Sequence, residues 1–237
     1  MNIKIAHFYP EFLNMYSDKG NIESLVKRCN WRGIETEISV INKEDEVDLS
    51  DVDILLIGGG ADSDRKITSE LFLKNKEKIK EYVENNKVLL ALTTGFLVLG
   101  NYYYINDEKI EGTGIVDMYS TKGKKRVISD IVVETPFGKV AGFENHSDKI
   151  YIGKNEPFGN VLYGSGNNGE DSYEGVIYKN VIGTNMYGPL LPKNPEIADE
   201  IIKRALENKY KKDIELASLD DFVEMEAKNY IIDMYIK

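Results

Sequence analysis

The chain has 237 residues, of which 42% are hydrophobic and 30% charged, and its formal net charge is −10 at pH 7 with a pI near 4.9. An acidic surface of this kind argues against nucleic acid or an anionic membrane as a partner. No stretch approaches the roughly 20 apolar residues that a membrane span needs, so we expect no membrane insertion. The only cysteine, Cys29, excludes an intramolecular disulfide and a cysteine-based zinc site.

The N-terminal segment lacks the basic head and the apolar run of a signal peptide. A reducing compartment fits the single cysteine. We therefore expect a soluble, cytoplasmic protein that folds as one domain over residues 1–237, without a metal ion or a cofactor.

The first hundred residues alternate strand-like and helix-like segments. Expected strands are 2–8, 34–41 near a sheet edge, 53–57 and 88–92. The last two are continuous apolar runs, which are typical of strands buried on both faces. A helix with Ile22, Leu25, Val26 and Cys29 on one face follows the turn at 16–21. A second helix is expected over 69–85, with Ser69 as its N-cap and Phe72, Ile79, Tyr82 and Val83 facing inward. This order predicts an α/β fold with a mostly parallel sheet flanked by helices.

The middle of the chain differs from the first part. Short strand-like runs are expected at 126–134, 138–143, 149–152, 161–163 and 175–182, with a glycine-rich turn at 164–169. They predict an antiparallel or mixed extension of the sheet. A helix begins at Asn194-Pro195-Glu196, with a cap, an N1 proline and an acidic first turn. The last helix is expected to begin at Ser218, and its apolar residues from Leu219 to Met234 form one stripe.

The segment from Val88 to Gly100 is the most informative, because a buried strand runs into a small-residue turn and then an apolar helix start. In nucleophilic α/β enzymes such a turn presents a reactive side chain above the sheet, and the N–H groups that follow form an oxyanion hole. A plain strand-to-helix crossover without chemistry has the same pattern. The pattern alone therefore indicates a candidate site and identifies no reaction.

Several segments together are more specific than any one of them. Residues 93–100, Thr-Thr-Gly-Phe-Leu-Val-Leu-Gly, are similar to the motif Cys-Gly-Gly-Tyr/Phe-Gln-x-Leu-Gly. Further matching segments are 16–21 (Tyr-Ser-Asp-Lys-Gly-Asn), 57–62 (Ile-Gly-Gly-Gly-Ala-Asp), 142–146 (Gly-Phe-Glu-Asn-His), 164–168 and 183–194. In this order they resemble class I glutamine amidotransferases of the cobyric acid synthase type, and specifically the small glutaminase (GatD) subunits of lipid II isoglutaminyl synthases. The resemblance implies a flavodoxin-like, mostly parallel sheet.

The resemblance assigns the family's nucleophilic cysteine to Thr93 and its activating histidine to Tyr187, while Thr94 stands at a motif glycine. Glutamine hydrolysis by this route needs a thiolate and an imidazole. A threonine hydroxyl ionises far less readily than a thiol, and a tyrosine with a pKa of about 10 is a poor base. Threonine is also β-branched, which is costly at φ > 0. We therefore expect that glutaminase activity is lost and that the turn has relaxed.

Three other residues could in principle replace the missing chemistry, and a structural role is the expectation for each. Cys29 lies on an apolar helix face, where a small buried hydrophobe is the ordinary interpretation. His7 ends a strand without a partner in the sequence. His146 matches a histidine of the family that is not its general base. An alternative nucleophile at Thr93 or Thr94 stays open.

Two positions are candidates for binding a substrate. By resemblance, Gly60 in the triple glycine 58–60 would supply an oxyanion-hole N–H, although a sharp strand end also needs glycine. Arg126 stands where the family has an arginine for the carboxylate of glutamine, a task suited to a guanidinium. It could equally be a solvated member of the basic run from Lys122. Glutamine therefore remains a candidate ligand, while Ala61 replaces a glutamine of the family's pocket.

Three functions follow from these observations. The first is a non-catalytic amidotransferase-like subunit that pairs with a Mur-ligase-like synthetase in the amidation of a peptidoglycan precursor. The second is an active glutaminase that uses unexpected residues. The third is a degenerate domain of the cobyric acid synthase type. A Mur-ligase-like reading frame beside the gene would favour the first.

Overall fold

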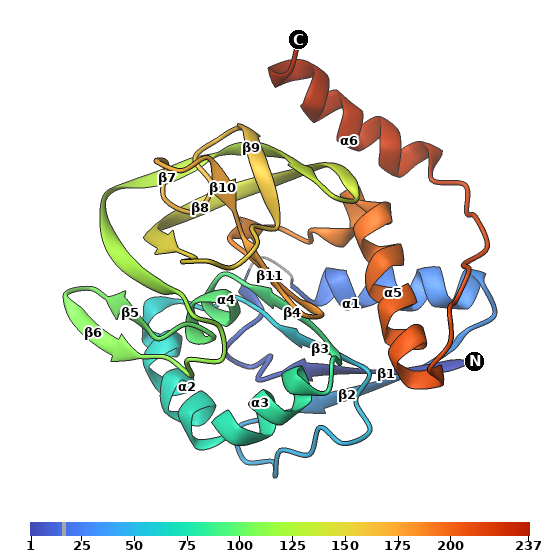
Figure 1. The fold of residues 1–237 in the computed structure, drawn as a ribbon, viewed down its shortest axis with the longest axis horizontal. Coiled ribbons are helices and arrows are strands. Elements are labelled where there is room, and N and C mark those ends of the chain that lie inside the picture. The colour runs from blue at the N-terminus through green and yellow to red at the C-terminus, as the bar shows by residue number, and fades with distance from the viewer. Residues whose placement is uncertain (16–17) are drawn as a thin grey trace.

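The computed structural model describes residues 1–15 and 18–237, so the first two residues of the expected turn at 16–21 lie outside the described residues. A larger sheet and a second sheet stacked beside it form the body of the molecule (Figure 1). The larger sheet has the strand order β11-β12-β4-β3-β1-β2 and is parallel except between β11 and β12. Its strands are β1 (Asn2–Phe8), β2 (Glu35–Ile41), β3 (Ile54–Ile57), β4 (Val88–Leu92), β11 (Val176–Tyr178) and β12 (Val181–Thr184).

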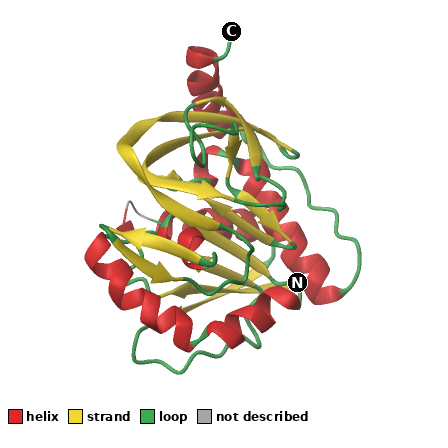
Figure 2. Cartoon of the chain, turned by 60° about the vertical axis from the view of Figure 1, so that its left-hand side comes forward, coloured by secondary structure: helices red, strands yellow, loops and turns green. Residues whose placement is uncertain are grey.

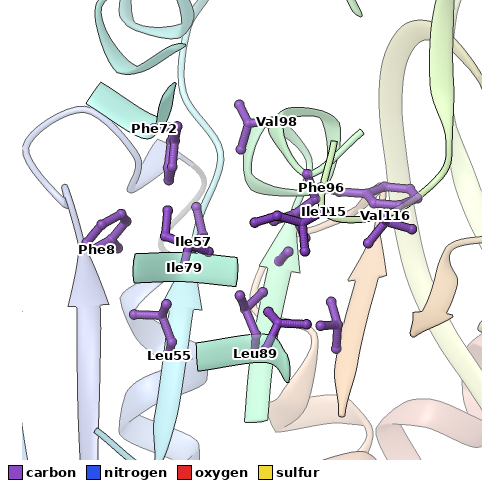
Figure 3. Close-up of a cluster of buried hydrophobic side chains, with 14 of the residues drawn as sticks. Phe8, Leu55, Ile57, Phe72, Ile79, Leu89, Phe96, Val98, Ile115 and Val116 are labelled. Carbon is purple, nitrogen blue, oxygen red and sulfur yellow. The ribbon is translucent and has the colours of Figure 1, made fainter. Parts of the chain in front are cut away.

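Helices cover both faces of this sheet (Figure 2). They are α1 (Lys19–Trp31), α2 (Asp62–Lys74), α3 (Lys76–Glu84), α4 (Thr94–Val98), a 3-10 turn η2 (Leu191–Lys193) and α5 (Pro195–Tyr210). The last helix, α6 (Phe222–Tyr235), instead packs against the second sheet, described below. Successive side chains of each strand point to opposite faces of the sheet, so alternate residues pack against the helices on each face. Leu55, Ile57 and Leu89 pack against α2, α3 and α4, as Figure 3 shows. Ile54, Leu56 and Leu90 pack against α1 and α5.

The strands predicted from continuous apolar runs are confirmed. Every residue of β3 and β4 is buried, and β2 lies at the sheet edge, as its alternation indicated. In α1 the expected Ile22, Leu25 and Cys29 are buried.

The helix expected over 69–85 is wrong in its extent. It is two helices, and Ser69 lies inside α2, where its hydroxyl donates to the carbonyl of Lys66. Asp62 and Asp64 occupy the first turn of α2, where acidic side chains complement the helix dipole. Asn75 separates the helices, and its side-chain amide donates to the carbonyl of Leu71. Such competition with the backbone is the usual reason why asparagine interrupts a helix.

The second sheet is antiparallel, with the order β10-β9-β7-β8-β13. Its strands are β7 (Tyr119–Thr135), β8 (Gly138–Tyr151), β9 (Gly159–Tyr163), β10 (Tyr173–Glu174) and β13 (Met186–Tyr187), and β5 (Tyr102–Ile105) pairs with β6 (Glu108–Glu111) beside it. The predicted fold class is confirmed, with the antiparallel strands forming a sheet of their own. Two details were wrong: segments 138–143 and 149–152 are one strand, and 175–182 contains the β11–β12 hairpin of the larger sheet.

One short stretch of chain belongs to both sheets. β12 ends at Thr184 in the larger sheet, and β13 begins at Met186 in the antiparallel one. The buried carboxylate of Glu174, from β10, accepts hydrogen bonds from the Thr184 hydroxyl at 2.6 Å and the Asn185 N–H at 2.9 Å. The two sheets are therefore joined by backbone and by a buried side chain.

The predicted start of α5 is confirmed, with Asn194 at the N-cap, Pro195 in the first turn and Glu196 as its acidic residue, but the side chain of Asn194 makes no capping bond. It instead pairs with the backbone N–H and carbonyl of Ala141 in β8, at 3.0 and 2.9 Å. α6 begins at Phe222 and not at Ser218, with Asp221 at its N-cap. Much of its predicted apolar stripe faces solvent, since Val223 and Tyr230 are 73% and 70% exposed.

Candidate functional site

The turn after β4 has the strained geometry of a nucleophile elbow. Thr93 has φ 49° and ψ −102°, so the expectation that this turn has relaxed is wrong. Its N–H donates to the carbonyl of Thr184 at 2.8 Å, and the N–H of Gly95 donates to the carbonyl of Gly58 at 3.1 Å. A β-carbon at Gly95 would lie 2.4 Å from the carbonyl oxygen of Ile57. Neighbouring strands thus hold the strained residue in place.

The Thr93 hydroxyl points at the glycine loop that follows β3. A β-carbon at Gly59 would lie 2.1 Å from Oγ1 of Thr93, so only glycine fits there. This oxygen is buried and makes no hydrogen bond within the described part of the chain. A hydroxyl becomes a nucleophile only when a base accepts its proton. In this arrangement no such base is bound to Thr93.

The hydroxyl of Thr94, the second threonine of the turn, accepts a hydrogen bond from the N–H that was expected to stabilise an oxyanion. The N–H of Gly60 donates to Oγ1 of Thr94 at 3.1 Å, and Nε of Arg65, from α2, donates to the same oxygen at 3.2 Å. Nη1 of Arg65 lies 3.3 Å from the carboxylate of Asp148. All four residues are buried. The position expected to receive an oxyanion is therefore filled by a threonine side chain that an ion pair supports.

The N–H of Gly59, which precedes Gly60 in the glycine loop, also has an acceptor, the buried carboxylate of Asp18. Oδ2 of Asp18 accepts the N–H of Gly59 at 2.8 Å. Burial raises the pKa of Asp18 to about 7, although the bond from Gly59 acts in the opposite direction. A β-carbon at Gly58 would lie 2.6 Å from the same oxygen. The N–H groups of Gly59 and Gly60 thus both have protein acceptors.

Tyr187 lies in β13, where it pairs with Phe143 of β8, and its side chain is buried. It is three residues beyond Thr184, whose carbonyl binds the N–H of Thr93. Burial acts to lower the pKa of Arg65, but Asp148 and then Tyr187 outweigh it and raise that pKa. The chain therefore brings the expected base position near the elbow, and a close contact between the side chains of Thr93 and Tyr187 stays a prediction.

Arg126 lies in an irregular part of β7, between Lys122 and Val127, where the pairing with β8 shifts register. Its side chain is exposed, and its Nε donates to Oδ1 of Asn145 at 2.6 Å. Asn145 belongs to the 142–146 segment of the resemblance. The role of Arg126 in holding a carboxylate stays a prediction.

The residues that could have replaced the catalytic pair have surroundings that suit structural roles. Burial raises the pKa of the Cys29 thiol to about 12 and lowers that of His7 to about 4. An inert thiol and a neutral histidine follow. For His146, burial is the largest influence and lowers the pKa, but Glu144, Glu174 and the carbonyl of Asp148 together outweigh it and raise that pKa. Its Nε2 lies 3.6 Å from the carboxylate of Glu144.

Sequence reasoning missed the parts that Asp18, Arg65 and Thr94 play. Thr94 had a signal, since it stands at a motif glycine, but nothing in the sequence pairs it with Gly60. Arg65 lies in an unremarkable charged segment. In residues 1–15 and 18–237 no group of three or more His, Cys, Asp or Glu side chains is placed to hold a metal ion. No helix in the described ranges has the length and apolarity needed to cross a membrane.

Comparison with known proteins gives consistent matches. The model of the CobB/CobQ-like glutamine amidotransferase domain matches residues 4–195. Lipid II isoglutaminyl synthase (glutamine-hydrolyzing) subunit GatD from Staphylococcus aureus (strain N315) is 38% identical over 98% of this chain and 95% of its own length. The subunit of the same name from Streptococcus pneumoniae (strain ATCC BAA-255 / R6) is 35% identical over 99% of this chain and 92% of its own.

Two further matches are more distant. A probable cobyric acid synthase from Methanosphaera stadtmanae is 27% identical over 82% of this chain but only 43% of its own length. A crystal structure of a glutamine amidotransferase has a TM-score of 0.58 at 15% identity, and the match covers 84% of this chain and 98% of that one. At this identity the likeness concerns the fold alone.

Proposed function

The chain belongs to the CobB/CobQ-like glutamine amidotransferase family, and from that premise we propose that it is the amidotransferase-like subunit of a lipid II isoglutaminyl synthase-type complex and does not itself hydrolyse glutamine. The partner is a cytoplasmic Mur-ligase-like synthetase. In the intact family, that synthetase activates a D-glutamate carboxylate of the lipid II stem peptide with ATP, and the small subunit supplies ammonia.

The subunit assignment is supported by how much of each relative is matched. The two subunits named GatD match nearly the whole chain and nearly their whole lengths. The cobyric acid synthase matches less of this chain at lower identity, which makes a degenerate domain of that type the weaker alternative. The choice between the two does not depend on whether the site is active.

The single observation that carries the loss of hydrolysis is the bond between Gly60 and Thr94. A tetrahedral intermediate needs donors aimed at its oxyanion, and removing one such donor costs on the order of 10² to 10³ in rate. Here the N–H of Gly60 already has an acceptor. The N–H of Gly60 is therefore not available to an oxyanion. The hydroxyl of Thr93 has no hydrogen-bonded base that would make it a nucleophile.

Without hydrolysis, the subunit would scaffold or regulate a synthetase that uses free ammonia. The retained elbow, the glycine loop and the segment 183–194 support a shape that is kept while the reaction is lost. An active glutaminase that works through Thr93 or Thr94 is the alternative, and it needs a base that the described part of the site does not supply to either hydroxyl.

The test is an amidation assay on lipid II with the purified subunit and the Mur-ligase-like protein of the same genome. Glutamine and an ammonium salt are compared as nitrogen donors, and free ammonia is measured from glutamine alone. We expect amidation with the ammonium salt and no ammonia from glutamine above buffer. Ammonia release that the Thr93→Ala variant abolishes, while Thr113→Ala retains it, would show that the proposal is wrong.

A further inference from the structure

Helix α6 is the part of the chain that the amidotransferase site leaves unexplained. It lies at the periphery of the molecule, beyond the antiparallel sheet, in both Figure 1 and Figure 2. Val223, Tyr230 and Met234 follow the spacing of one helix face and are 73%, 70% and 50% exposed. Phe222 beside them is 69% exposed. We call these four residues the outer face of α6. Several exposed apolar side chains gathered on one helix mark an interaction surface.

Specific polar contacts fix the orientation of the helix. Arg28 of α1 is nearly inaccessible, and its guanidinium binds Asp221 at the start of α6 and Asp199 of α5, at 2.5 and 2.6 Å. Lys228, buried on the inner side, pairs with Glu196. These ion pairs hold the first half of α6 against α1 and α5, with the outer face turned away from them.

The far end of the helix is held in the same way. The hydroxyl of Tyr235 donates to the carboxylate of Asp130 in β7 at 2.9 Å, and its ring stacks on Tyr163 with centroids 3.9 Å apart. Ile232 packs inward against Val132 and Ala141. The helix is therefore a fixed element and not a loose tail, so its exposed apolar face is a built feature.

A groove adjoins the N-terminal turn of α6. It has a volume of about 300 Å³ and is lined by Trp31, Leu191, Pro192 and Glu224, among others. Trp31, the only tryptophan of the chain, is 59% exposed. Tryptophan is enriched among the residues that contribute most to the binding energy of interfaces.

The charges around the outer face argue against a second copy of this chain as its partner. Glu224, Glu226 and Asp233 flank the apolar residues and make no ion pair within the described ranges. Two copies would bring the same acidic rim, on two chains of net charge −10, into contact. The surface instead fits a different protein that offers an apolar groove with basic residues at its edges.

The limits of the family domain indicate which protein this is. The family model ends at residue 195, before α6, while the free-standing GatD subunits match nearly the whole chain. The cobyric acid synthase carries its matching part within a longer chain. We propose, resting on the function proposed above, that the outer face of α6 and the Trp31 groove dock onto the synthetase subunit.

The test measures the affinity between the purified chain and the Mur-ligase-like protein of the same genome by isothermal titration calorimetry. The variant Val223→Glu/Tyr230→Glu places two charges on the outer face. The control, Ile38→Glu/Val40→Glu, places the same two charges on exposed apolar residues of β2, far from α6 in the sequence. We expect at least a 100-fold weaker Kd for the α6 variant and a change of less than threefold for the control, with both retaining the thermal midpoint of the parent chain.

The outcomes separate the two proposals. If the parent chain binds and the α6 variant binds equally well, the docking surface is wrong and the subunit assignment stands. If the parent chain does not bind at micromolar concentration, the subunit assignment itself fails. A parent chain that dimerises alone, and a monomeric α6 variant, would show that the outer face serves a second copy and would overturn the inference.

Discussion

The N–H of Gly60 donates a hydrogen bond to the hydroxyl oxygen of Thr94 across a separation of 3.1 Å. The two residues come from the ends of adjacent parallel strands, 34 positions apart in the chain. A glycine at position 94 would leave that N–H open toward the site. One hydroxyl group therefore decides whether an anion could be stabilised here, independently of the nucleophile.

Stepwise restoration of the family residues should show this independence. We expect little or no ammonia release from Thr93→Cys/Tyr187→His, because the N–H of Gly60 stays occupied. Adding Thr94→Gly frees that donor and should raise the rate by on the order of 10². Release of ammonia from glutamine, measured enzymatically for both variants at equal concentration, decides the matter.

Equal rates for the double and triple variants would contradict a role for Thr94. Thr94→Gly in the parent background is the control, and it should stay inactive because it has neither thiol nor imidazole. Thermal unfolding of each variant shows that a missing rate is not a missing fold.

Because Thr93 has a positive φ, a glycine variant at this position should be more stable than an alanine variant, the reverse of the usual order. At position 93 we expect Thr93→Gly to be more stable than Thr93→Ala by about 1 kcal/mol, because an L-residue in the left-handed region costs roughly that much. Thr68, buried inside α2, is the comparison, and there alanine should exceed glycine by about 1 kcal/mol. Denaturant unfolding of the four variants measures both differences, and the same order at both positions would show that the turn is unstrained in solution.

The pH dependence of stability should contain a contribution from Asp18. Its pKa is raised from 3.8 to about 7 in the folded chain. A raised carboxyl pKa contributes stability that is complete below pH 3.8 and lost as the pH rises through about 7. Asp18→Asn keeps an acceptor for the N–H of Gly59 and does not titrate.

The thermal midpoint of Asp18→Asn, relative to the parent chain, should therefore rise between pH 4 and pH 8. The corresponding free energy is about 4 kcal/mol, at about 1.4 kcal/mol for each pKa unit. Differential scanning calorimetry in buffers of constant ionic strength follows the difference. A difference that does not vary with pH would mean that Asp18 is not a buried carboxyl in solution.

Loss of Arg28 should free α6 from the body of the molecule. Arg28→Ala leaves Asp221 without its cation, while Asp199 keeps its pair with Arg32. Because both carboxylates are partly exposed, we expect a cost of about 1–3 kcal/mol, that of leaving a polar group without its partner. We expect rapid proteolytic cleavage in the segment 211–221, and mass spectrometry of the fragments measures it. Lys19→Ala, which removes an exposed pair with Glu23, should cost less than about 1 kcal/mol and leave cleavage unchanged.

Hydrophobic pattern predicted the buried strands well and the polar ones poorly. β3 and β4 are continuous apolar runs, and both are where the pattern put them. β8 was divided in two because Glu144, His146 and Asp148 alternate along its buried face. Buried polar residues that satisfy one another look like a surface loop in a sequence, since no pattern encodes their partners.

For the same reason, the hydrophobic pattern could not predict the orientation of α6 or the hydrogen bonds within the site. An apolar stripe predicts a buried face, but the pairing of Arg28 with Asp221 fixes the stripe outward. The positions Thr93 and Tyr187 follow from resemblance to the family. The bond between Thr94 and Gly60 follows only from the three-dimensional approach of two strands.

The tie between Glu174 and the chain at Thr184 and Asn185 bears on cooperativity. Because this carboxylate sits in one sheet and its two donors at the end of the other, neither sheet can open without exposing an uncompensated buried polar group. A calorimetric scan should accordingly show one endotherm, with a van't Hoff enthalpy equal to the measured enthalpy. Slow amide exchange at Asn185 would then report global unfolding, since its hydrogen bond breaks only when both sheets do.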